Sequence, residues 1–92
     1  MKRTRREELM VLLEESTYSA RALAEFTNAR VADVEADLEH VRKSRRKDFQ
    51  ITPAECFECG FVFSSRTRLD APSRCPKCRS ERIEPPAFTL ET

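Results

Sequence analysis

Four cysteines in two close pairs constrain this chain more than any other feature. Residues 56–78 read CFECGFVFSSRTRLDAPSRCPKC, so two residues lie within each pair and fifteen residues separate the pairs. Thiolates at this spacing are typical of a four-cysteine zinc site. We therefore predict a zinc ribbon in which a structural zinc ion is bound by Cys56, Cys59, Cys75 and Cys78.

The remaining sequence favours a metal site over disulfides. It has no apolar run of eighteen residues and no signal peptide with a cleavage site, so we expect a cytoplasmic protein whose thiols stay reduced. Iron held as in rubredoxin is the closest rival, because iron accepts the same thiolates. A redox dithiol is less favoured, because neither CxxC opens a helix in a βαβ pattern. Four cysteine ligands leave no open position for a catalytic water, so we predict no enzyme here.

The turns around the cysteines carry further signals. Gly60 follows the second cysteine, where such a turn tends to need a positive φ angle, and Pro76 presets φ inside the second turn. Arg79 follows the fourth cysteine, where a second glycine would be usual. Because a left-handed residue other than glycine costs roughly 1–2 kcal/mol, we expect this turn to be either strained or differently shaped. The segment 61–63 (FVF) is predicted to form a strand beside the site.

Three helices are predicted before the cysteines. The first starts at Thr4, which forms a capping box with Glu7, and it ends at Ser16 and Thr17. The second is capped by Ser19 and closed by a left-handed Asn28. The third runs from about 31 to 44. Apolar residues at helical spacing are expected to face a shared core: Leu9, Leu12 and Leu13, then Ala20, Leu23, Ala24 and Phe26, then Val31, Val34, Leu38 and Val41.

Two strands are predicted around the cysteine segment. Residues 49–52 and 88–91 both alternate apolar and polar side chains; Pro53 ends the first segment, and the second comes after Pro85 and Pro86. If they pair, Phe49, Ile51, Phe88 and Leu90 cover the open side of the helices. The prediction is an α+β fold, a winged helix-turn-helix core with a two-stranded wing sheet and an inserted zinc ribbon. Its parts are residues 1–53, the ribbon at 54–84, and the closing strand at 85–92.

The order of these elements resembles a small archaeal family of proposed transcriptional regulators. The segments that carry the resemblance are SARALAEF, VEADLEHVRKS, PAECFECGFVF, PSRCPKC and PPAFTLE, which together cover most of residues 19–91. In that family a rubredoxin-like zinc ribbon replaces the wing of a winged helix-turn-helix. The resemblance implies a DNA-binding regulator.

Local charge bears on that function, since the formal net charge is only +1. Basic residues near the end of the third helix and at the ribbon tip are expected to contact DNA phosphates. The predicted nucleic-acid-binding residues are Arg30, Arg42, Lys43, Arg45, Arg46, Lys47, Arg66 and Arg68. An N-terminal arm of Lys2, Arg3, Arg5 and Arg6 is a further candidate.

The same helix carries a contrary signal. Its groove-facing first turns contain acids, and the net charge from Arg30 to Val41 is −3. Acids near a helix start also suit the helix dipole. The alternative function is a protein-interaction module that meets a basic partner through exposed Asp33, Glu35, Asp37 and Glu39. His40 is interpreted as a surface histidine, and a homodimer is left open.

Overall fold

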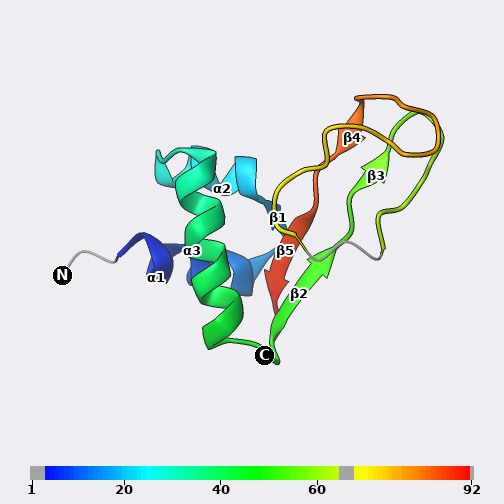
Figure 1. Cartoon of the computed structure of the whole chain (residues 1–92). Helices are drawn as coiled ribbons and strands as arrows, with labels where there is room; N and C mark the ends of the chain where they lie inside the picture. The colour runs from blue at the N-terminus through cyan, green and yellow to red at the C-terminus, as the bar shows by residue number, and fades with distance from the viewer. Residues whose placement is uncertain (1–3, 65–67, 92) are drawn as a thin grey trace.

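The chain folds into a helical part and a ribbon that projects from it (Figure 1). The computed structural model describes residues 4–64 and 68–91. The elements in chain order are α1 (Arg5–Glu15), β1 (Tyr18–Ser19), α2 (Ala20–Thr27), α3 (Val31–Ser44), β2 (Phe49–Thr52), β3 (Glu55–Cys56), β4 (Ile83–Glu84) and β5 (Ala87–Leu90). None of the helices in the described ranges is long and apolar enough to span a membrane.

Capping residues set the helix ends as predicted. The Thr4 hydroxyl accepts a hydrogen bond from the Glu7 backbone N–H at 3.2 Å, and the Glu7 carboxylate accepts one from the Thr4 N–H at 3.3 Å. The Ser19 hydroxyl accepts from the Ala22 N–H at 3.2 Å at the start of α2. Asn28 closes α2 at φ 54°, and α3 begins three residues later. The left-handed Asn28 therefore produces the tight turn between α2 and α3.

The predicted sheet forms and gains a strand. β2 and β5 pair antiparallel, with Phe49 opposite Leu90 and Ile51 opposite Phe88. This face covers the helices, since Phe49, Phe88 and Leu90 are buried and Ile51 packs beside them. β1 pairs with the other edge of β5, so the sheet has three strands in the order β1-β5-β2. Two residues are too few to show an alternating pattern, so the sequence did not reveal β1.

Two residues assigned to the apolar stripes are exposed instead of buried. Phe26 is 61% exposed and contacts only the edge of the Tyr18 ring among aromatic side chains of the described residues, with centroids 5.3 Å apart. Val31 is 40% exposed because it is the first residue of α3, while the buried stripe starts one turn later at Val34. The stripe prediction was wrong at both positions, since helical spacing alone does not say where the packed neighbour ends.

The ribbon leaves the far end of the β2–β5 pair. β3 and β4 pair antiparallel, with Glu55 opposite Glu84 and Cys56 opposite Ile83. The strand predicted at 61–63 is reduced to a single bridge between Val62 and Glu55, because the chain turns away after Phe63. From the following loop, Leu69 returns to the helices and is 3% exposed within their core. The ribbon is thus tied to the helical part at two places, through the strands and through Leu69.

Candidate functional site

The cysteine pairs lie on two turns of matching shape. In the first, the Gly60 N–H donates to the Cys56 carbonyl at 2.9 Å, and Gly60 has φ 77°. In the second, the Arg79 N–H donates to the Cys75 carbonyl at 2.9 Å, and Arg79 has φ 63°. Arg79 therefore adopts the left-handed conformation expected of a glycine at that position, so the second turn keeps the shape of the first and carries the strain of a non-glycine residue. Each turn aims both of its sulfurs at the same point between the turns.

The four sulfur atoms are spaced for one metal ion. The Sγ atoms of Cys56 and Cys78 are 3.5 Å apart, and those of Cys59 and Cys75 are 3.6 Å apart. All four lie within 4.8 Å of one another. A tetrahedral ion with metal–sulfur bonds of about 2.3 Å requires sulfur separations of about 3.8 Å. Cys56, Cys59, Cys75 and Cys78 are therefore positioned to bind a metal ion.

The electrostatics of the thiols also favour a cation. Burial disfavours the Cys75 thiolate, but hydrogen bonds from the backbone N–H groups of Cys78 and Lys77 and from neighbouring thiols lower its pKa to about 7. At Cys78 the backbone N–H of Ser80 favours the thiolate, yet burial and the other three thiols raise its pKa to about 12. The Cys75 thiol therefore ionises readily and the Cys78 thiol resists ionisation, because negative charge accumulates among the four sulfur atoms. A divalent cation removes that penalty.

Four of the eight basic residues predicted to meet DNA are already paired with carboxylates. Arg30 pairs with Asp33 at 3.0 Å, and Arg42 pairs with Glu39 at 2.6 Å. Arg45 contacts both Asp48 at 3.0 Å and Glu14 at 3.6 Å, and Arg68 contacts Asp70 at 3.1 Å. Such pairs reduce the positive field that each arginine offers to a phosphate.

Three predicted cations remain available at one end of α3. Lys43, Arg46 and Lys47 are exposed and form no ion pair with any residue in the described ranges. They occupy the last turn of α3 and the connection to β2. Arg66, Lys2 and Arg3 lie outside the described residues, so their predicted roles stay predictions.

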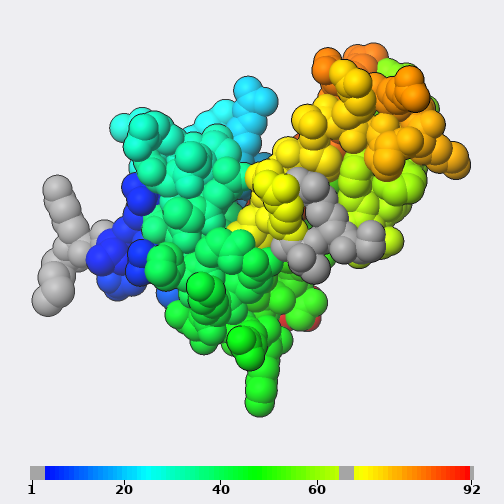
Figure 2. Space-filling view, viewed as in Figure 1, coloured from blue at the N-terminus to red at the C-terminus, as the bar shows by residue number. Residues whose placement is uncertain are grey.

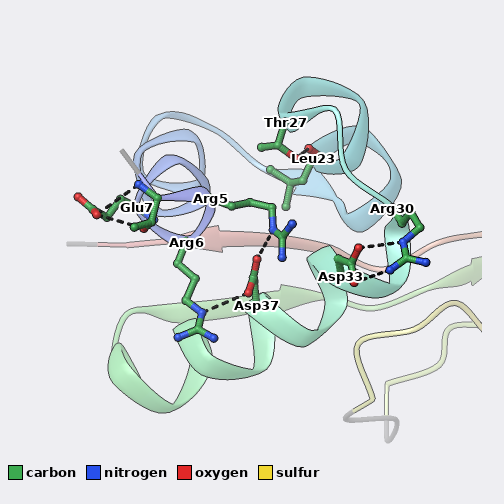
Figure 3. A network of polar contacts seen from close by, with 9 residues as sticks. Arg5, Arg6, Glu7, Leu23, Thr27, Arg30, Asp33 and Asp37 are labelled. Atoms are coloured by element: carbon green, nitrogen blue, oxygen red, sulfur yellow. Dashed lines mark hydrogen bonds and ion pairs between the residues drawn. The ribbon is translucent and has the colours of Figure 1, made fainter. Parts of the chain in front are cut away.

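The N-terminal arm prediction was wrong for Arg5 and Arg6. Both belong to α1 and point at Asp37 on α3, which accepts hydrogen bonds from the two guanidinium groups (Figure 3). Burial alone would raise the pKa of Asp37, but these hydrogen bonds and charges hold that pKa below its usual range. The two arginines and Asp37 therefore clamp α1 to α3.

The exposed acidic face predicted on α3 is correspondingly smaller. Asp37 is only 5% exposed, because the approach of α1 covers it, and it cannot meet a partner. Asp33 and Glu39 are engaged by Arg30 and Arg42. Glu35 alone among these four acids forms no ion pair with a described residue. His40 is exposed, in line with its interpretation as a surface histidine.

Comparison with known proteins shows which family this architecture belongs to. Residues 4–52 match the model described as PF0610-like, N-terminal, and residues 53–92 match the PF0610 rubredoxin-like zinc beta-ribbon domain. The chain belongs to the PF0610 family. Its sequence is 39% identical to protein PF0610 from Pyrococcus furiosus, whose solution NMR structure superimposes with a TM-score of 0.78. That alignment covers 96% of this chain and 89% of the Pyrococcus protein. No curated protein matches the sequence.

Membership in the PF0610 family supports the rubredoxin-like zinc ribbon that the sequence predicted. The names of the two family models and of the Pyrococcus protein include a zinc ribbon and no regulator. The boundary between the two family models falls between β2 and β3, where the chain passes from the helical part into the ribbon.

Proposed function

We propose that this PF0610-family protein is a winged helix-turn-helix regulator that binds double-stranded DNA and holds a structural zinc ion in the ribbon. The tight α2–α3 turn at Asn28 supports the helix-turn-helix assignment. The β2–β5 pair lies beside α3 and carries the ribbon at its far end, the place of a wing (Figure 1). The all-cysteine ligand set supports zinc in a structural role.

The observation that carries the DNA proposal is the cluster Lys43, Arg46 and Lys47, which no acid among residues 4–64 and 68–91 pairs with. Exposed cations gathered at one end of a candidate recognition helix are suited to neutralise backbone phosphates. The first turns of α3 expose Ala32 and Ala36 beside acids, so they offer few base-edge contacts. We therefore expect affinity to come mostly from the phosphate backbone, with weak sequence preference.

The test is the salt dependence of binding to random duplex DNA. A variant with Lys43, Arg46 and Lys47 all changed to Ala should bind more weakly, and the slope of log K against log salt should fall by about 0.9 per lost phosphate contact. A matched control removes three exposed cations from the ribbon, Arg74, Lys77 and Arg82, and should retain more of the slope. Unmeasurable binding of the unaltered protein at low salt would refute the proposal.

A further inference from the structure

A recess separates the helical part from the ribbon (Figure 2). Its volume is about 480 Å³, within the range of about 300–1,000 Å³ typical of small-molecule sites. Its walls come from the starts of α2 and α3, from the ribbon loop, and from β4 and the prolines that follow it. The lining residues are Ala20, Arg21, Val31, Glu35, Leu69, Ala71, Ile83, Pro85 and Pro86.

Seven of these nine lining side chains are apolar. Leu69 and Pro86 are buried, and Val31 is 40% exposed on the wall formed by α3. Helical spacing had placed Val31 in the core, but its exposed side chain instead lines the recess. The recess offers apolar surface that a ligand can remove from water.

The two charged lining residues, Arg21 and Glu35, form no ion pair with any residue that the structure describes. Arg21 is exposed at the start of α2 and forms no ion pair with a described residue. Glu35 is half-buried and likewise forms no ion pair with a described residue, whereas Asp33 and Glu39 on the same helix are paired. Burial and the nearby Asp70 carboxylate raise the pKa of Glu35. The positive charge of an incoming ammonium group would offset both effects by stabilising the ionised carboxylate.

We infer that this recess binds a free α-amino acid with a large apolar side chain. The ammonium group pairs with Glu35, the carboxylate pairs with Arg21, and the side chain packs against Val31, Leu69 and Ile83. A ligand held this way contacts α2, α3 and the ribbon together, so it stabilises their arrangement by mass action. The inference does not rest on DNA binding, because ligand binding is measured on the protein alone.

The probe is L-phenylalanine, compared by calorimetry and amide NMR with 2-phenylethylamine and 3-phenylpropionate. Phenylalanine should bind most tightly, because each of the other compounds lacks one charged group. Glu35→Gln should weaken phenylalanine about tenfold and should not weaken 3-phenylpropionate, whose carboxylate it no longer repels. Arg21→Gln should weaken phenylalanine by a similar factor and should not weaken 2-phenylethylamine, whose ammonium group it no longer repels. Amide shifts should concentrate at residues 31, 35, 69 and 83.

Two control variants distinguish binding in the recess from effects of charge elsewhere and from unfolding. Glu25→Gln removes an exposed carboxylate of α2 outside the recess and should leave all three affinities unchanged. Ala71→Trp fills the recess from an exposed position, so it should abolish binding without unfolding the core.

Any of four results would overturn the inference. Three of them are no saturation by phenylalanine up to about 10 mM, equal affinity for phenylalanine and 3-phenylpropionate, and unchanged phenylalanine binding in Glu35→Gln. Tighter binding of a peptide with an N-terminal phenylalanine would also contradict it, since the occupant would then be a chain terminus.

Discussion

The helical part and the ribbon are held together by different interactions. In the helical part, Leu9, Leu13, Leu23 and Leu38 are fully buried around Phe88, so the hydrophobic effect stabilises it directly. The ribbon contributes little apolar burial of its own, since its largest buried apolar side chain, Leu69, lies in the helical core. Its own centre is the cluster of four sulfurs. One small chain therefore combines a core that is stabilised by apolar burial with a lobe whose centre is a candidate metal site.

Metal removal should produce the largest difference between the two parts. Metal binding contributes on the order of 10 kcal/mol to the folding of such a lobe. We expect a chelator, or Cys56→Ser, to collapse the amide dispersion of residues 54–84 while the helical signal in circular dichroism largely persists. An unchanged ribbon spectrum after verified metal loss would show that the metal is not structural. Metal analysis of the purified protein distinguishes zinc from iron, which would also colour it red.

Leu69→Ala tests the link between the parts. Loss of this buried side chain should lower the free energy of unfolding of the helical part by about 2–4 kcal/mol, although the residue belongs to the ribbon loop. Metal affinity should change little, because the ligands lie elsewhere in the ribbon. Phe57→Ala is the control, since Phe57 is 67% exposed and its loss should cost under about 0.5 kcal/mol. Equal effects of the two variants in denaturant titrations would mean that Leu69 does not couple the parts.

Asp37→Asn should weaken only the helical part, by about 1 kcal/mol at neutral pH, because both partner arginines are substantially exposed. The pKa of Asp37 is lowered on folding, so its stabilisation is fully present above the unfolded pKa of about 3.9. It disappears as the pH falls through the folded pKa. Unfolding measured across this range should show the variant and the unaltered protein converging in acid. As a control, Asp33→Asn removes a more exposed pair and should lower the free energy of unfolding by less. If the stability difference between Asp37→Asn and the unaltered protein persists in acid, the ionic mechanism is excluded.

The smallest expected effects come from the two turns that carry the cysteines. Arg79→Gly should stabilise the ribbon by up to about 1 kcal/mol, because glycine adopts a φ of 63° without strain. Gly60→Ala should destabilise it by about 1 kcal/mol through the backbone alone, since no atom lies within 4 Å of the added Cβ. Metal competition assays would register both changes. Shifts of the same sign would show that the turns are not equivalent.

Much of this molecule could be predicted from local sequence. The helix ends follow from Thr4, Ser19 and Asn28, whose side chains or backbone act within four residues. The strand pairing follows from alternation at 49–52 and 88–91. The convergence of the cysteines follows from the two CxxC spacings, because each short turn aims both thiols the same way.

The tertiary structure alone decided which surfaces remain available. Asp37 looked like an exposed acid until α1 brought Arg5 and Arg6 onto it. Leu69 carried no periodic signal, yet the ribbon loop delivers it to the helical core. Val31 had the spacing of a core residue but faces a recess that forms only when the ribbon stands beside α3. Caps and ligand spacings depend on neighbours in sequence, so the chain alone determined them. Burial and charge pairing depend on which distant elements meet, and only the assembled fold determines that.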